Sequence, residues 1–233
     1  MLTDTEAVIL RQVKTVNGRR MLTMFTKKYG KISVGANESS GGKSKTNLAT
    51  RPFTYGKYEL YKNQDSYNLS SGQVLESYYE IGEDFDKFQA ASYVLELTDR
   101  LLPEDMQQAK LFVQLTDFLS ALSKRSKAHR TLILAYIVKA LDILGSYPEL
   151  GADSSIEDGG IRGENYTKSP LIYSGKFDIV EILEFFRKEP FKKFEKLALN
   201  PEIERELLAI LREYLGYHFD IARLKSEEFE TGI

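Results

Sequence analysis

The chain has 233 residues, 42% of them hydrophobic, which is enough for one large domain or two smaller ones with a buried core. It has no cysteine, which excludes disulfides and thiolate metal sites and indicates a cytoplasmic protein. It has no apolar run of about 18 residues and no basic segment followed by an apolar one at its N-terminus, so neither a membrane span nor a signal peptide is expected. Its net charge of −2 combines a charge of +8 in residues 1–62, which hold 12 basic and 4 acidic residues, with −10 in the remainder.

The first 76 residues show the period-two pattern of short strands. Strands are expected at 5–13, 21–26, 31–35, 53–62 and 67–76. The Asn17-Gly18 pair predicts a hairpin turn between the first two. Five short strands in about 75 residues predict a small closed barrel of the OB type, and an SH3-like barrel fits the same count.

From about residue 84 the hydrophobic period changes to 3.6, which predicts helices. The first predicted helix ends before Pro103, and the second carries an apolar stripe from Leu111 to Leu122. A third, at about 131–144, is apolar almost all round and is therefore expected at the centre of a helical bundle, with Gly145 as its C-terminal cap.

The last third of the chain begins with a segment rich in Gly and Ser, 151–174, which predicts a long loop. Helices then resume, and Asn200-Pro201 predicts a helix start with Asn as the N-cap. The pattern as a whole predicts an α+β fold. An OB-fold barrel is expected over residues 1–78, followed by an all-helical domain over residues 79–233.

No catalytic constellation stands out. Gly41-Gly42-Lys43-Ser44 is similar to the end of a phosphate-binding loop, but Asn37 occupies the place of its first glycine and no helix is predicted after Lys43. His129 and His218 are the only histidines, and structural roles are favoured for both. We therefore expect no enzyme, no cofactor and no metal.

The basic N-terminal part predicts an anionic partner, with nucleic acid as the first candidate and ordinary clustered surface charge as the alternative. Aromatic rings are interleaved with its cations, and alternation along the fourth strand places Tyr55 and Tyr61 on one face and Tyr58 on the other, inside the barrel. The expected DNA contacts are Arg11, Lys14, Arg19, Arg20, Lys27, Lys28, Lys31, Lys43, Lys45 and Arg51.

A second basic cluster precedes the third predicted helix. It consists of Lys124, Arg125, Lys127 and Arg130. Cations beside an apolar helix suit an acidic peptide that ends in apolar residues, or a second contact with DNA. A solvated helix junction is the alternative.

Several segments, taken in order, resemble blocks of one known family. They are TEAVILR at 5–11, LTMFT at 22–26, GK at 30–31, KSK at 43–45, PFTYG at 52–56, ELTD at 96–99, YPEL at 147–150 and LKS at 224–226. Together they resemble the bacterial RecO recombination proteins over nearly the whole chain. Two features depart from the family: the four-cysteine zinc element that many members carry after the Pro-Glu-Leu segment has no cysteine here, and the basic run after the third strand is diluted at 36–43.

The resemblance implies an N-terminal OB fold, a C-terminal helical domain and a non-catalytic recombination mediator. Such a protein binds single- and double-stranded DNA, anneals complementary strands and, with RecR, promotes RecA loading on DNA covered by single-stranded DNA-binding protein (SSB), whose acidic tail it captures. A monomer in the nucleoid-containing cytoplasm is expected. The residues themselves leave two alternatives to a DNA-binding protein. The first is a protein-interaction adaptor with an OB-like module, and the second is an NTP-using enzyme.

Overall fold

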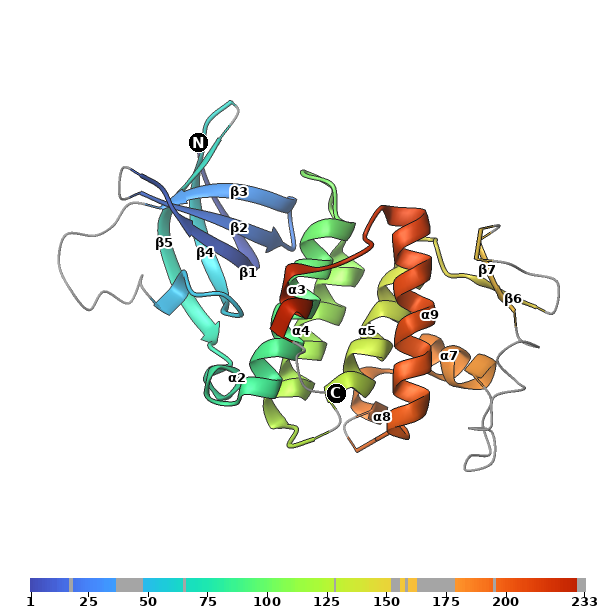
Figure 1. The fold of residues 1–233 in the computed structure, drawn as a ribbon. Coiled ribbons are helices and arrows are strands. Elements are labelled where there is room, and N and C mark those ends of the chain that lie inside the picture. Colours follow the sequence, from blue (N-terminus) through green and yellow to red (C-terminus); the bar gives the residue numbers. More distant parts are fainter. Residues whose placement is uncertain are drawn as a thin grey trace. The chain divides into compact units, whose positions relative to one another are not determined.

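The structure is a computed structural model of the chain (Figure 1). It describes residues 1–16, 19–36, 48–64, 66–127, 129–151, 156–157, 159–162, 179–194 and 196–229. Packing divides the chain into two compact units, Met1–Ser123 (unit 1) and Lys124–Ile233 (unit 2). Unit 1 holds the barrel together with helices beyond residue 78, so the domain boundary expected at residues 78–79 stays a prediction.

Unit 1 begins with a closed five-stranded barrel. Its strands are β1 (Leu2–Lys14), β2 (Arg20–Thr26), β3 (Gly30–Ala36), β4 (Tyr55–Lys62) and β5 (Tyr67–Glu76). The strand order is β1-β2-β3-β5-β4, and β4 pairs back with β1 to close the barrel. All pairs are antiparallel except β3 with β5, which meet only at Val34–Tyr67 and Gly35–Asn68. This arrangement confirms the expected α+β fold with an OB-type barrel at its N-terminus.

The barrel is filled by the inward-facing residues of all five strands. Leu22, Met24, Val34 and Leu60 are almost fully buried, and Tyr58 is only 1% exposed. The Tyr58 hydroxyl donates to the Ala49 carbonyl at 2.7 Å, and burial raises the pKa of this phenol. The placement of Tyr58 inside the barrel, expected from strand alternation, is confirmed.

After the barrel, the described part of unit 1 continues with the helices α2 (Tyr79–Glu83), α3 (Phe85–Leu101) and α4 (Ala109–Lys124). Asp84 caps α3 by accepting a hydrogen bond from the Lys87 amide, and α3 ends just before Pro103, as expected. The ring of Phe112 on α4 contacts the barrel rings of Phe25 and Tyr55 edge to face, at centroid distances of 5.6 and 6.0 Å. These aromatic contacts pack α4 on the barrel.

The turn between β2 and β3 is docked on the segment that joins α3 to α4. The Asp105 amide donates to the Lys31 carbonyl at 3.0 Å, and the Gln107 side chain donates to the Lys27 carbonyl at 3.1 Å. Gly30 adopts a φ of 73°, and a Cβ placed on it would lie 2.1 Å from the Met106 carbonyl oxygen. Only glycine allows both the left-handed backbone and this close approach.

Unit 2 is built around α5 (His129–Ile143), which is buried along its whole middle, as its uniform hydrophobicity predicts. The other elements among its described residues are α7 (Ile179–Lys188), α8 (Phe191–Phe194), α9 (Pro201–Phe219), the 3-10 helix η2 (Lys225–Phe229) and the strands β6 (Glu149–Gly151) and β7 (Gly160–Arg162). Helices α7, α8 and α9 pack against α5. Both expected caps are confirmed. At the end of α5, Gly145 has a φ of 74° and the next amide, that of Ser146, donates to the Leu141 carbonyl. At the start of α9, the Asn200 side chain accepts a hydrogen bond from the Glu202 amide.

The segment expected as a Gly/Ser-rich loop, 151–174, contains β7, which pairs in parallel with β6 at the start of the segment. The sequence did not predict these strands, because three residues are too few for a period-two pattern to show. Residues 152–155, 158 and 163–174 of that loop lie outside the described residues, as do the Asn17-Gly18 turn and the segment 37–47 with its Gly-Gly-Lys-Ser motif. None of the helices in the described part of the chain is both long and apolar enough to cross a membrane.

Candidate nucleic-acid interface

Most of the cations expected to bind DNA lie on the surface of the barrel. Arg11, Lys14, Arg19, Lys27, Lys28 and Arg51 are exposed, whereas Arg20 and Lys31 are partly buried. Lys43 and Lys45 lie outside the described residues. The exposed cations differ in what surrounds them, and this difference separates possible phosphate contacts from structural ion pairs.

Lys31 is a structural residue. Its side chain is 14% exposed, and its ammonium contacts both the carboxylate of Asp99, at 3.2 Å, and the Asp99 carbonyl. This ion pair connects β3 to the C-terminal part of α3. The Arg11 guanidinium lies 3.9 Å from the other Asp99 oxygen but keeps 64% of its side chain exposed. Arg11 therefore remains accessible to a ligand, whereas Lys31 does not.

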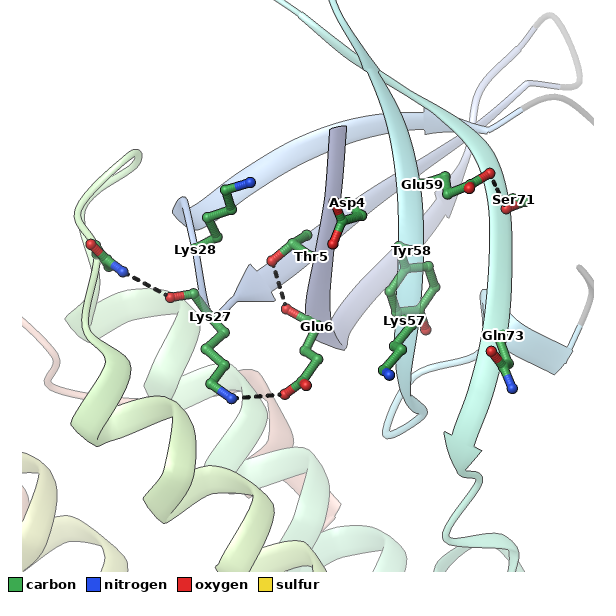
Figure 2. A pocket seen from close by; sticks show the side chains of 11 residues that line it. Asp4, Thr5, Glu6, Lys27, Lys28, Lys57, Tyr58, Glu59, Ser71 and Gln73 are labelled. Atoms are coloured by element: carbon green, nitrogen blue, oxygen red, sulfur yellow. Dashed lines mark hydrogen bonds and ion pairs between the residues drawn. The ribbon is translucent and has the colours of Figure 1, made fainter. Parts of the chain in front are cut away.

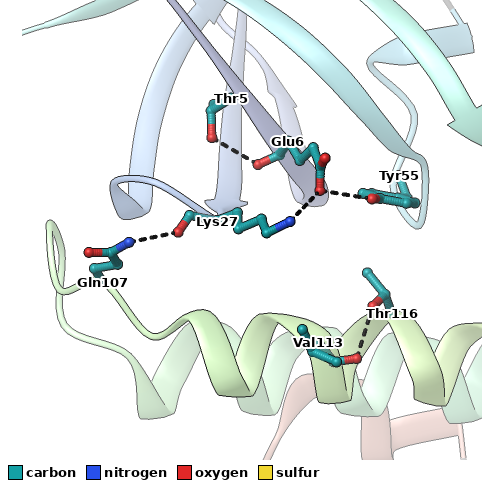
Figure 3. A network of polar contacts seen from close by, with 7 residues as sticks. All are labelled: Thr5, Glu6, Lys27, Tyr55, Gln107, Val113 and Thr116. Atoms are coloured by element: carbon teal, nitrogen blue, oxygen red, sulfur yellow. Dashed lines mark hydrogen bonds and ion pairs between the residues drawn. The ribbon is translucent and has the colours of Figure 1, made fainter.

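Lys27 belongs to a polar network around Glu6 (Figure 3). Its ammonium lies 3.1 Å from Glu6 Oε2, and the Tyr55 hydroxyl donates to the same oxygen at 3.0 Å. The hydrogen bond from Lys27, more than the one from Tyr55, holds the pKa of Glu6 below its usual value, although partial burial opposes this. Burial first, and then the Glu6 carboxylate, raise the pKa of Tyr55 to about 12.

We expect this network to stabilise unit 1 in a pH-dependent way. The pKa of Glu6 is lower in the folded state than in the unfolded chain, where it is about 4.3. Its contribution is therefore present above that pH and is lost as the pH falls through the folded-state pKa. In chemical denaturation, Glu6→Gln should lower the free energy of unfolding at pH 7, and it should do so by less at pH 3. If the Lys27→Met/Glu6→Gln double variant has the same free energy of unfolding as either single variant, the two side chains act as a pair. Equal effects of Glu6→Gln at both pH values would contradict the pH-dependent stabilisation.

A hollow of about 660 Å³ lies on the outer face of β1, β4 and β5 (Figure 2). The strand register places Glu6 opposite Lys57 and Asp4 opposite Glu59. The charged residues of the hollow are Lys27, Lys28, Lys57, Asp4, Glu6 and Glu59. In Figure 2 the Lys27 ammonium points to Glu6, whereas Lys28 extends away from it. Because three cations offset three carboxylates, a polyanion gains little electrostatic attraction in this hollow.

A different group of side chains combines exposed cations with aromatic rings. We name it the cation–tyrosine row, and it consists of Arg19, Asn68, Tyr67, Lys62, Tyr29 and Lys28. The Lys62 ammonium lies 5.3 Å from the ring centroid of Tyr67 and 5.4 Å from that of Tyr29. Lys28 lies 5.4 Å from the Tyr29 ring, and the two rings are 5.7 Å apart. The Arg19 guanidinium donates to the Asn68 side chain, which extends the row by one more cation.

The barrel connections bring these residues together. Lys62 and Tyr67 are cross-strand partners at the two ends of the β4–β5 connection. Arg19 ends the β1–β2 connection, and it reaches Asn68 over β3 at Gly35, where an added Cβ would lie 2.6 Å from the guanidinium. Tyr29, in the β2–β3 turn, is held by a hydrogen bond with the Thr3 hydroxyl. The row therefore spans three connections of one barrel.

The cation–tyrosine row combines exposed cations with partly buried aromatic rings. Arg19, Lys28 and Lys62 are exposed, whereas Tyr29 and Tyr67 are half-buried against the barrel core. The hydrogen bond with Thr3, followed by the two neighbouring lysines, lowers the pKa of the Tyr29 phenol. The Tyr67 hydroxyl raises the pKa of Lys62. Such a surface offers cations to phosphates and ring faces to bases.

Sequence reasoning named Arg19 and Lys28 as contacts. It counted Lys62 among the basic residues of the N-terminal part without naming it as a contact, and it did not single out Tyr67 or Asn68. A usable signal was present, because residues on both sides of a short turn between two predicted strands become cross-strand neighbours. Of the other rings considered, Tyr55 packs on Phe112, and Tyr61 is 51% exposed.

In unit 2 the structure places the four cations of the second cluster differently from one another. Lys124 and Lys127 are exposed, and Arg130 is half-buried. Arg125 is only 7% exposed, and its guanidinium donates to the carbonyls of Lys127, Phe194 and Leu197. Arg125 thus has a structural role. His218 also makes a structural contact, with its Nε2 2.6 Å from the Ile156 carbonyl.

Comparisons with known proteins agree with the resemblance inferred from the sequence. The family model described as "Recombination protein O N terminal" matches residues 1–78, and the one described as "Recombination protein O C terminal" matches residues 82–228. A protein of Thermoanaerobacter sp. (strain X514) named DNA repair protein RecO is 25% identical over 242 residues, covering 98% of this chain and 96% of its own. One of Alkaliphilus metalliredigens (strain QYMF) with the same name is 26% identical over 246 residues and the whole of both chains. The chain therefore belongs to the RecO family of DNA repair and recombination proteins.

Proposed function

We propose that this protein binds single- and double-stranded DNA through its barrel and helps complementary strands to pair, without a catalytic step of its own. Its family membership supports a role in DNA repair and recombination. The observation that carries the proposal is the cation–tyrosine row, which flanks the β1–β2 and β4–β5 connections. OB folds bind oligonucleotides at these two connections, and the placement is an analogy with that fold.

The mechanism is physical. Lys and Arg side chains neutralise phosphates and release counterions, so two strands that normally repel each other can approach. Bases stack on aromatic rings at about 1–3 kcal/mol each, whatever their identity. Because Tyr29 and Tyr67 are held in place before DNA arrives, less side-chain freedom is lost on binding. The surface therefore suits binding that depends on salt but not on sequence.

The finer parts of the proposal follow from family membership. With RecR, the protein promotes RecA loading on DNA covered by SSB, and it recognises the acidic tail of SSB. It acts at the nucleoid in the cytoplasm as a monomer. A protein-interaction adaptor is the alternative, in which the barrel binds a protein and DNA affinity is incidental.

A triple variant, Arg19→Ala/Lys28→Ala/Lys62→Ala, tests the proposal. Affinity for a fluorescent single-stranded oligonucleotide is measured by anisotropy across a salt series. We expect affinity at low salt to fall about tenfold or more, and the slope of log affinity against log salt to fall by about two, since each phosphate contact contributes roughly 0.7.

The matched control is Lys57→Ala/Lys110→Ala/Arg223→Ala, which removes three exposed charges outside the row. At about 0.15 M salt it should leave the affinity within about twofold of the original protein, because a charge that does not contact the DNA is largely screened at that ionic strength. If the row variant retains both affinity and slope, the barrel row is not the DNA site and the adaptor becomes the better proposal.

A further inference from the structure

Unit 2 contains a group of lysines that the barrel site does not use. Although the chain after residue 62 carries a net charge of −10, the segment 187–196 holds five basic and two acidic residues. It covers the end of α7, the whole of α8 and the residues after it. Lys192, Lys193 and Lys196 are all exposed. The sequence pattern did not single out this segment.

The buried guanidinium of Arg125 brings this segment to the second basic cluster. It donates to the Phe194 carbonyl at 2.7 Å and also to the carbonyls of Leu197 and Lys127. The backbone around Lys196 and the backbone of Lys127 therefore meet at one side chain. A further bond, from the Leu199 amide to the Thr131 hydroxyl at 3.2 Å, holds the same segment to α5.

The neighbouring charges are largely accounted for. Arg187 and Lys188 pair with Glu184, at 3.3 and 2.7 Å, and Lys193 pairs with Glu189 at 3.5 Å. Glu204 is buried, and its carboxylate bonds to the Thr131 hydroxyl. Within the described residues, Lys127, Lys192 and Lys196 form no ion pair, so their exposed ammonium groups are available to an anion.

The surroundings favour a nucleic-acid backbone over an acidic peptide. An acidic peptide with an apolar end needs an apolar pocket beside the cations. In the described residues of 124–130 and 187–199, no large apolar side chain is exposed, and Phe191 and Phe194 are buried. Lysines on flexible stems, without a pocket, suit phosphates as point charges.

We propose that Lys127, Lys192 and Lys196 form a second DNA-backbone site, which holds one strand while the barrel holds another. This inference rests on the proposed function, because a second site is useful only to a protein that pairs strands. It gives unit 2 a role in annealing rather than in first-strand binding. Arg125 is the positioning residue that keeps the two lysine-bearing segments together.

The test uses the full-length protein and the variant Lys127→Ala/Lys192→Ala/Lys196→Ala. Two quantities are measured: affinity for one fluorescent oligonucleotide, and the rate of annealing of two complementary oligonucleotides labelled for energy transfer. We expect first-strand affinity to change less than about twofold and the annealing rate to fall about tenfold, with a weaker dependence on salt. The charge-preserving variant Lys127→Arg/Lys192→Arg/Lys196→Arg should anneal at the original rate.

The outcomes separate this inference from the function it rests on. An unchanged annealing rate in the alanine variant overturns the second site, while loss of binding in the barrel-row variant would still support the barrel site. Loss of affinity for a labelled acidic peptide with an apolar end, with annealing intact, also overturns it and assigns the lysines to a protein partner. The Lys57→Ala/Lys110→Ala/Arg223→Ala control excludes an effect of net charge, and thermal unfolding checks that each variant is folded.

Discussion

Replacing Gly30 with alanine is expected to destabilise unit 1 by about 3 kcal/mol. Two effects add: a left-handed backbone is unfavourable for alanine, and a Cβ 2.1 Å from the Met106 carbonyl oxygen forces the turn away from the α3–α4 segment. Because the contact is with backbone, no side-chain rotation relieves it. Hydrogen exchange at the Asp105 amide, which donates to Lys31, should report the loss locally, and chemical denaturation should report it globally.

Gly145→Ala is the matched control. Gly145 has nearly the same φ, 74° against 73°, but nothing lies within 4 Å of an added Cβ. Its substitution should therefore show the backbone penalty alone, about 1 kcal/mol. If Gly30→Ala is as mild as Gly145→Ala, the β2–β3 turn is not held tightly against the segment that joins α3 to α4.

Replacing Arg125 with methionine should destabilise unit 2 by about 3 kcal/mol. Methionine keeps much of the side-chain volume but removes the Arg125 donor from the carbonyls of Lys127 and Leu197. The Phe194 carbonyl loses one of its two donors and keeps the Leu197 amide at 3.0 Å. A buried carbonyl without a partner costs about 1–3 kcal/mol. Part of this cost is offset, because methionine carries no charge and folding no longer has to desolvate a guanidinium. Thermal and chemical unfolding measure the effect. Arg125→Lys should recover part of it, since one ammonium does not reach three separate acceptors.

Lys127→Met provides the contrast within the same segment. Lys127 is exposed, so its loss should change the unfolding free energy by less than about 0.5 kcal/mol while slowing annealing. If Arg125→Met is as stable as the original protein but no longer binds a ligand, Arg125 is a contact residue, as its position in a basic cluster suggests. The two variants together distinguish a side chain that binds from one that holds the binding segment in place.

Local patterns were sufficient for the five barrel strands and for the long helices of this fold. Alternation placed Tyr58 inside the barrel, uniform hydrophobicity placed α5 at the centre of unit 2, and cap chemistry located Gly145 and Asn200. These features are predictable because each depends on residues within a few positions of one another. The β6–β7 pair was missed for the same reason, since its strands are too short to carry a pattern.

The roles of the charged residues depend on partners far away in the chain. Lys31 meets Asp99 across 68 positions, and Arg125 meets Leu197 across 72, so both look like surface cations in the sequence and are structural in the fold. Conversely, Lys62 meets Tyr67 across the local β4–β5 connection, but it meets Tyr29 only when the barrel closes. Composition indicated that the N-terminal part is basic, but only tertiary packing determines which charges are neutralised and which remain exposed, because ion pairing depends on distances of a few ångströms that local sequence does not encode.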